Sequence, residues 1–342
     1  DWDTAVSIAR AQVDAGAEVL DVCMDDALLN AHEAMENFLR HLSSDPDVAR
    51  VPIMVDSSDF TVIETGLRCL QGRSVVNSIS LRDGDAAFVE RAKLIKRYGA
   101  AVIVMLADEE GQAVTTERRV SIAQRSYQLL TNGAGYLPHE IIFDPNVLTV
   151  GTGMAEHASY ALSFIESCRI ISQQCPGALI SGGVSNLSFA FRGNNHLREA
   201  LHAVFLHHAK EAGLSMAIIN PETLPSITDV DITLRELCED LILNRRSDAT
   251  ERLITHSKQL GTKVEAQVKH NQWEDLAPRQ RLEYAIEHGE VAHLTSDVSK
   301  VLLEQGSAIG VVEGPMMSAM KRVGQRFNAG ELFLSQVVKS AR

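Results

Sequence analysis

The stretch "EIIFDPN" (residues 140–146) places a short apolar run directly before an aspartate and an asparagine. An apolar run without polar alternation is typical of a parallel β-strand that is buried on both faces. Six other stretches share this design: "AEVLDVCMD" (17–25), "VPIMVDSS" (51–58), "SVVNSISL" (74–81), "AAVIVMLADEEG" (100–111), "ALISGGVSN" (178–186) and "LSMAIIN" (214–220). The repetition predicts seven strands of one parallel sheet.

Helical patterns such as "DAAFVERAKLIKRYG" (85–99) separate these runs, which predicts an α/β protein. Two architectures compete. An open doubly wound sheet would tolerate seven strands, but no G-x-G-x-x-G motif follows the first run. We therefore expect a (β/α)8 TIM barrel that lacks its first strand. The chain begins directly on a helical pattern, so we expect the missing strand upstream of Asp1 and expect this sequence to be a fragment.

Polar residues stand at the end of nearly every predicted strand: Asp21, Asp25, Asp56, Asn77, Asp108, Asp144, Asn146, Asn186 and Asn220. One such residue is usually a turn or a helix cap. Strand ends of a barrel converge on one mouth, so the repeated pattern favours a binding site there.

The residue types at this mouth indicate what it binds. Carboxylates accept from ring N–H and amino groups, and carboxamides both donate and accept, so the set suits a planar, nitrogen-rich heterocycle. No lysine closes a strand, which argues against a Schiff base. Ser185 and Ser188 have no histidine nearby in sequence to complete a hydrolytic triad.

The strand pattern stops after Asn220, and helical patterns follow. We expect a barrel domain over residues 1–259, a polar linker over 260–277, and a small four-helix bundle over 278–342 that is truncated at its C-terminus. Glycines separate the four helical patterns of this bundle.

Composition excludes several function classes. The net charge of −13 and the absence of a basic stripe argue against nucleic acid as a partner. No apolar run approaches the ~18 residues of a membrane span. The five cysteines are scattered, which favours free thiols and a cytoplasmic protein, and the twelve histidines show no metal-binding spacing.

Two sets of motifs resemble known proteins. "VPIMVDSS", "VVNSIS", "YGAAVIVM", "DEEGQA", "IIFDPN", "SGGVSNLSFAFRGNN" (181–195) and "LREALHAVFLHHA", in this order, resemble the pterin-binding domain of cobalamin-dependent methionine synthases. "EGPMMSAM" (313–320) and "FNAGELFLSQVVKSAR" (327–342) resemble the helical cap of their cobalamin-binding module. Corrinoid methyltransferases of acetogens share the barrel without a fused cap. Dihydropteroate synthase shares the barrel and a similar aspartate, but "DEEGQA" and the chain order favour the methionine synthases.

The resemblance implies an enzyme that moves a methyl group from 5-methyltetrahydrofolate to cobalamin and then to homocysteine (EC 2.1.1.13). It places Asp56, Asn77 and Asp144 against the pterin ring and Asn186 next to the methyl-bearing N5. Asn186 and Asp144 would be the catalytic pair. Asp21 and Asn220 would also bind the substrate, and Arg192 would meet its carboxylate-bearing tail.

In the cap, the resemblance implies that Phe327, Leu334, Val337 and Val338 cover the upper face of cobalamin. It implies no metal in this chain, since zinc would belong to a separate homocysteine domain. The expected partners are that domain, the cobalamin-binding domain and the reactivation domain of the full-length enzyme.

Two departures bear on the site: Cys23 stands where the family has an asparagine, and "IINPETLP" (218–225) replaces the family's usual loop after Asn220. Two alternatives stay open. One is a stand-alone corrinoid methyltransferase with a separate corrinoid protein, and the other is a degenerate pterin-binding module without catalysis.

Overall fold

A computed structural model describes residues 1–261, 276–289, 291, 293–329 and 331–341, with residues 258–261 described as backbone alone. Six parallel strands form the main sheet: β1 (Leu20–Cys23), β2 (Ile53–Asp56), β3 (Val75–Ile79), β4 (Ala101–Met105), β7 (Ile141–Asp144) and β8 (Leu179–Ile180). They lie side by side in chain order, and every neighbouring pair is parallel. A doubly wound sheet would reverse its order at a switch point, so the order is that of a barrel. The predicted TIM-barrel-like α/β fold is confirmed.

The seventh predicted strand is weaker than the others. Its only bridge in the described part of the chain joins Gly183 to Ile218 in parallel, and the Ile218 N–H donates to the Gly182 carbonyl at 2.9 Å. The expectation that the strand within residues 100–111 ends at Asp108 is wrong, because β4 ends at Met105. The chain turns after Met105 into a hairpin of β5 (Ala107–Asp108) and β6 (Gly111–Gln112).

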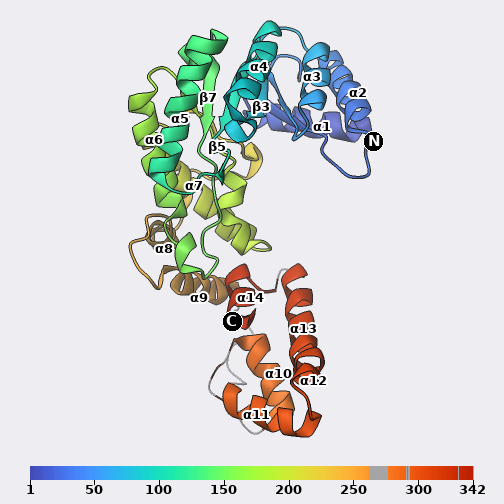
Figure 1. Cartoon of the computed structure of the whole chain (residues 1–342), viewed down its shortest axis with the longest axis vertical. Coiled ribbons are helices and arrows are strands. Elements are labelled where there is room, and N and C mark those ends of the chain that lie inside the picture. Colours follow the sequence, from blue (N-terminus) through green and yellow to red (C-terminus); the bar gives the residue numbers. More distant parts are fainter. Residues whose placement is uncertain (262–275, 290, 292, 330, 342) are drawn as a thin grey trace. The chain divides into compact units, whose positions relative to one another are not determined.

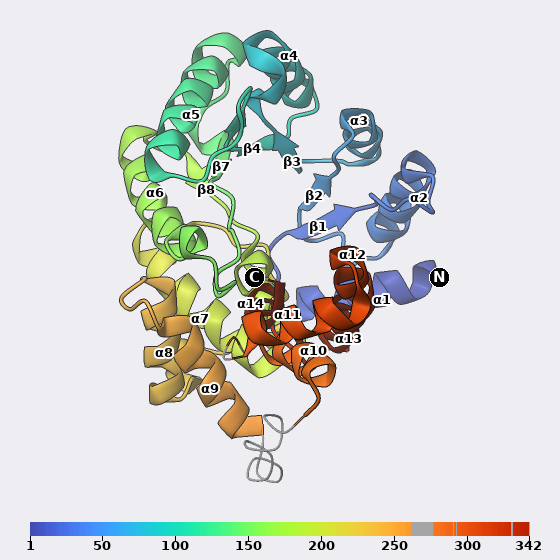
Figure 2. The same ribbon diagram turned by 60° about the horizontal axis from the view of Figure 1, so that its bottom comes forward.

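Amphipathic helices cover the outer face of the sheet. They are α1 (Trp2–Asp14), α2 (Ala31–Ser44), α3 (Phe60–Cys69), α4 (Gly84–Arg97), α5 (Thr116–Gln128) and α6 (Tyr160–Gln174). Figure 2 shows α2 to α5 outside the arc formed by the strands. Asn30, Asp59 and Thr115 cap three of these helices by accepting backbone N–H groups. The outward side chains of β1 and β2, such as Val22 and Val55, pack against α1 and α2.

The alternate side chains of the strands face the inside of the arc. There, Met54, Val75, Ala101, Ile103 and Ile142 form a second apolar cluster. Side chains two residues further along a strand lie on the same face. The interior therefore changes from an apolar floor to polar strand ends.

Shorter turns of helix join these elements: η1 (Leu81–Asp83), η2 (Leu129–Ala134), η3 (Pro138–Glu140), η4 (Ala155–His157), η5 (Val184–Phe191), η6 (Pro221–Thr223) and η7 (Ile227–Asp229). The longer helices α7 (Asn195–Glu211), α8 (Ile232–Ile242) and α9 (Ala249–Gly261) follow η5 and η7. α8 and α9 are separated at Asn244, whose φ of 49° lies in the left-handed region.

Most of the predicted linker, residues 260–277, lies outside the described residues. The bundle after it contains α10 (Pro278–His288), α11 (Leu294–Gln305), α12 (Ala308–Val311), η8 (Val312–Met316), α13 (Met317–Asn328) and α14 (Leu334–Ala341) (Figure 1). α12, η8 and α13 follow one another without a break, so four helical segments result, as predicted. Leu282, Ile286, Val301, Val311 and Ala319 form the core of this bundle.

The backbone divides into two compact units. The first, Asp1–Val147, Leu162–Ser185 and Phe205–Pro225, contains the sheet. The second is Leu148–Ala161, Asn186–Val204 and Ser226–Arg342. The domain boundaries expected from the sequence stay a prediction. None of the described helices combines the length and apolar character that crossing a membrane requires.

Candidate functional site

Three predicted site residues meet where β1, β2 and β3 end. In the sheet register, Cys23 lies opposite Asp56, and Asp56 lies opposite Asn77. The side-chain amide of Asn77 donates a hydrogen bond to the carboxylate of Asp21. Leu20 and Val22 pack on the helix side of β1, so Asp21 faces the interior.

Asp21, Cys23, Asp56 and Asn77 form a polar cluster, in which both carboxyl groups have a raised pKa. Desolvation and the charge of Asp56 raise the pKa of Asp21 to about 7, against the hydrogen bond from Asn77, which lowers it. The side chain of Asp21 is still reached by solvent, so the protein around the mouth desolvates it without enclosing it. Desolvation and the charge of Asp25 raise the pKa of Asp56 to about 6, while the Cys23 thiol donates to Asp56 and lowers it. Near neutral pH, the cluster can therefore both donate and accept protons.

Asp144 ends β7 opposite Met105 of β4. Its Oδ1 accepts the Asn146 N–H at 2.7 Å. Burial raises the pKa of Asp144 to about 6, and the Asn146 hydrogen bond and the positive charge of Arg119 act in the other direction. Asp144 is thus a third interior carboxyl group with a raised pKa.

Arg119 is a site residue that sequence reasoning missed. Its side chain is fully buried, and its guanidinium donates to the Asn146 carbonyl at 3.0 Å and to Ser163 Oγ at 3.1 Å. It shares the buried face of α5 with Ile122, Ala123 and Ser126. An arginine in the i, i+3, i+4 row of an apolar helix face was the available signal.

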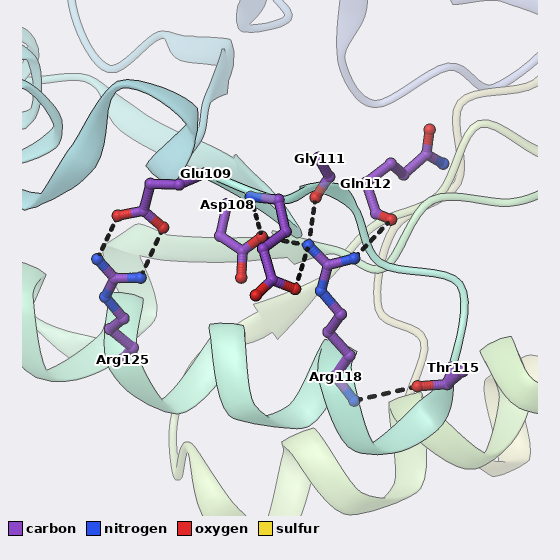
Figure 3. A network of polar contacts seen from close by, with 8 residues as sticks. Asp108, Glu109, Gly111, Gln112, Thr115, Arg118 and Arg125 are labelled. Carbon is purple, nitrogen blue, oxygen red and sulfur yellow. Dashed lines mark hydrogen bonds and ion pairs between the residues drawn. The ribbon is translucent and has the colours of Figure 1, made fainter.

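Other polar strand ends have local roles. Asp25 accepts hydrogen bonds from Ser57 Oγ at 2.6 Å, Ser58 N at 2.6 Å and Ser58 Oγ at 2.7 Å. Desolvation opposes these bonds, but together they lower the pKa of Asp25. Asn220 caps η6 by accepting the Glu222 N–H at 3.1 Å, and Asp108 pairs with Arg118 (Figure 3). For these residues, the turn and cap interpretation explains the observed contacts.

Asn186 and Arg192 belong to the second unit. Asn186 lies in η5 with its side chain exposed, and Arg192 follows η5 and is also exposed. The backbone around Asn186 is held in place, since Thr149 Oγ1 donates to the Asn186 carbonyl at 2.9 Å and Val150 N donates to Leu187 O at 3.0 Å. An exposed amide on a fixed backbone is available to a ligand.

Ser188 does have a histidine partner, which corrects the expectation from sequence. Its Oγ lies 2.8 Å from His202 Nε2 and accepts from Arg198 Nε at 3.0 Å. Burial, followed by the charge of Arg198, lowers the pKa of His202 to about 4, so the ring is neutral and accepts the Ser188 proton. Ser188 is fully buried, and its oxygen is already engaged by a cation. The group anchors η5 to α7 and is not arranged as a nucleophile.

The four cap residues lie on the last helices of the bundle. Phe327 is in α13, and Leu334, Val337 and Val338 are in α14. All four are only partly buried, and none belongs to the core cluster of the bundle. Apolar side chains that the core does not use fit an apolar ligand surface.

The raised pKa of Asp144 makes a prediction for stability. In the unfolded chain the carboxyl group ionises near its ordinary pKa of 3.8, but in the fold it keeps its proton to about pH 6. The folded state therefore binds more protons between these values, and this contribution to stability is lost as pH rises. Asn mimics the neutral acid, so we expect Asp144→Asn to melt at a higher temperature than wild type. This difference in melting temperature should be about 3–6 °C larger at pH 7.5 than at pH 5.

Thermal melts of both proteins at the two pH values test this prediction. His202, whose pKa is lowered, contributes to stability with the opposite pH dependence. This contribution is the same in both proteins, so it cancels when their melting temperatures are compared. A difference that stays constant with pH would show that Asp144 ionises normally.

Comparisons with known proteins give two family matches in this chain. Residues 1–220 match the pterin binding enzyme family, and residues 278–342 match the B12 binding domain family. Among the described residues, no cluster of three or more His, Cys, Asp or Glu side chains could hold a metal ion.

Solved structures of dihydropteroate synthases are similar to this chain. The Clostridium difficile enzyme is 15% identical with a TM-score of 0.47, covering 70% of this chain and 87% of its own. The Thermus thermophilus enzyme is 20% identical with a TM-score of 0.44, covering 65% and 84%. The Coxiella burnetii enzyme is 16% identical with a TM-score of 0.48, covering 72% and 86%. The match to the pterin binding enzyme family spans well over half of this chain, and the chain therefore belongs to that family.

Proposed function

We propose that this protein transfers the methyl group of 5-methyltetrahydrofolate to cob(I)alamin, as a step in the synthesis of methionine from homocysteine. One observation carries the proposal: a pterin-binding barrel and a B12-binding helical region occur in the same chain. A folate substrate and a corrinoid acceptor are what a methyltransferase of this kind brings together.

The barrel mouth suits the pterin ring of this substrate. Asp56, Asp144 and Asp21 supply carboxyl oxygens that accept from the amino group and ring N–H groups, and Asn77 supplies an amide. Asn220 would extend this set, and Arg192 would pair with the carboxylates of the glutamyl tail. The desolvated setting that raises the pKa values of the carboxyl groups also strengthens each hydrogen bond that they form.

Asn186 is the residue that we assign to the reacting nitrogen. The N5 of the substrate is a poor leaving group unless it gains positive charge or a proton. An amide beside N5 stabilises that charge in the transition state more than in the ground state. The anchored backbone of η5 costs little reorganisation when the reaction occurs.

Phe327, Leu334, Val337 and Val338 would hold the cobalamin cofactor under an apolar cover. When bound, the cofactor supplies a Co(I) nucleophile that accepts the methyl group. The cover would exclude water from the reactive centre. In the complete reaction, separate cobalamin-binding, homocysteine and reactivation domains would act with this chain, with zinc in the homocysteine domain alone.

Methyl transfer to free cob(I)alamin tests the proposal. The protein is mixed anaerobically with 5-methyltetrahydrofolate and free cob(I)alamin, and the corrin absorbance is followed. We expect turnover that needs the methylated folate, with tetrahydrofolate as the control. Absence of both turnover and folate binding by calorimetry would overturn the proposal. Turnover only after adding a separate corrinoid protein would support a stand-alone corrinoid methyltransferase instead.

Cys23 is the feature that favours a degenerate binding module, since a thiol replaces an amide beside Asp56. The thiol still donates to Asp56, so we expect wild type to bind 5-methyltetrahydrofolate. Cys23→Asn should improve the affinity by no more than about tenfold, the value of one hydrogen bond. Calorimetry with both proteins decides the matter, because binding by the variant alone would indicate a degenerate site.

A further inference from the structure

The loop at residues 149–154 holds the segment that carries Asn186. Both belong to the second compact unit. At the start of the loop, Thr149 Oγ1 donates to the Asn186 carbonyl at 2.9 Å. Gly151 follows with a φ of 71°, and a Cβ atom there would lie 2.4 Å from the ring of Phe191. The loop therefore packs directly on Phe191, the last residue of η5.

The same loop also contacts α14, which belongs to the same compact unit. Gly153 has a φ of 78°, and a Cβ atom there would lie 3.3 Å from Ser335 Cβ. The ring of Phe333, directly before α14, meets the ring of Phe191 edge-on, with 5.5 Å between the ring centroids. Phe191 is fully buried and Phe333 is 9% exposed. The loop and Phe191 thus form one surface on which α14 is docked.

The docked position of α14 has unfavourable features as well as favourable ones. Burial of Phe333 and its aromatic contact stabilise it. However, the Oγ atom of Ser335 is buried and has no hydrogen-bond partner within the described part of the chain, which is costly. A cavity of about 960 Å³ also lies beside the contact, and its lining includes Gly151, Gly153 and Val338. Such incomplete packing is typical of an element that can detach while the rest of the fold stays intact.

The proposed substrate contacts the same segment of the chain. Asn186 lies in η5, and Arg192 directly follows Phe191. In the function proposed above, Asn186 contacts N5 and Arg192 pairs with the carboxylates of the glutamyl tail. Phe191 therefore lies between these ligand contacts and the ring of Phe333. A ligand that fixes this segment also fixes the surface on which α14 is docked.

We propose that folate binding and the docking of α14 on Phe191 and the 149–154 loop are coupled, so that each strengthens the other. The inference rests on the proposed function, because it takes the folate as the ligand of η5. Such coupling is reciprocal, so folate stabilises the docked helix by the same factor by which docking tightens folate binding. Val338, which is assigned to the cobalamin cover, lies on this helix. Bound folate therefore acts on a helix that the cobalamin cover uses.

Phe333→Ala removes the ring that meets Phe191, so α14 should be docked for a smaller fraction of the time. We expect the Kd for 5-methyltetrahydrofolate in calorimetry to rise about fivefold, because only the docked fraction binds at full strength. Leu303→Ala is the matched control, since Leu303 is an 86% exposed apolar side chain of α11 in the same bundle. Its Kd should equal that of wild type.

Ser335→Ala should act in the opposite direction. It removes the hydroxyl group that the docked position buries without a partner, so docking becomes more favourable. The Kd for the folate should then fall about twofold. Opposite shifts from two nearby residues cannot both result from unfolding of the bundle. Hydrogen exchange in α14 measures the reciprocal effect, and saturating folate should slow it in wild type more than in Phe333→Ala.

The outcomes separate this inference from the proposed function. If wild type binds the folate and both variants bind equally well, the coupling is refuted and the proposed function stands. If both variants lose affinity and melting temperature together, α14 only supports the fold and our inference is wrong. If wild type does not bind the folate, the proposed function fails and the coupling fails with it.

Discussion

Asn186→Ala should slow methyl transfer by about 10²-fold while the Kd for 5-methyltetrahydrofolate changes little. The amide is assigned to stabilise charge on N5 that develops only in the transition state, so its removal acts on kcat. The side chain is exposed, whereas its backbone carbonyl is the atom that Thr149 holds. Truncation at Cβ should therefore leave the fold of η5 intact.

Single-turnover methyl transfer to cob(I)alamin, together with calorimetric binding, measures both quantities. Asn195→Ala is a suitable control, because Asn195 is also exposed but begins α7 after the segment ends. It should transfer the methyl group at the wild-type rate. Equal losses of rate and affinity in Asn186→Ala would mean that Asn186 only holds the ligand.

Arg119→Met should lower the free energy of unfolding by about 3 kcal/mol. Methionine nearly fills the space, but it leaves the Asn146 carbonyl and Ser163 Oγ without the donors that Arg119 provides. It also removes the positive charge that lowers the pKa of Asp144. The pKa of Asp144 should then rise further, so folate binding that needs its ionised form should require a higher pH.

Urea unfolding gives the stability, and calorimetry between pH 5.5 and 8 gives the binding profile. Arg125→Met is the matched control on the same helix, since Arg125 forms a partly exposed ion pair with Glu109 and Asp85. Such pairs contribute about 0–1 kcal/mol. If both variants lose the same small amount, the buried position of Arg119 has no special importance.

The sequence predicted the strands because a short strand that is buried on both faces is a continuous run of apolar residues. "EIIFDPN" became β7 with Asp144 at its end, as expected. The seventh run, residues 214–220, was also expected to be a strand, but its pairing in the described part of the chain is one isolated bridge at Ile218. The hairpin after Met105 was missed because Leu106 and Ala107 continue the apolar pattern through the turn.

The sequence predicted only part of the chemistry at the mouth of the barrel. The sequence by itself determined the parallel α/β order, the polar strand ends and the resemblance to a pterin-binding and B12-binding chain, because these depend on residue type and chain order. Only the tertiary structure decided that Asn77 donates to Asp21, that Ser188 meets His202 and that buried Arg119 lies close enough to influence Asp144. These contacts join residues far apart in the chain or involve an arginine that sequence would place on a surface. The distances between these side chains and the desolvation of their polar groups depend on how distant segments pack together, which a local sequence pattern does not encode.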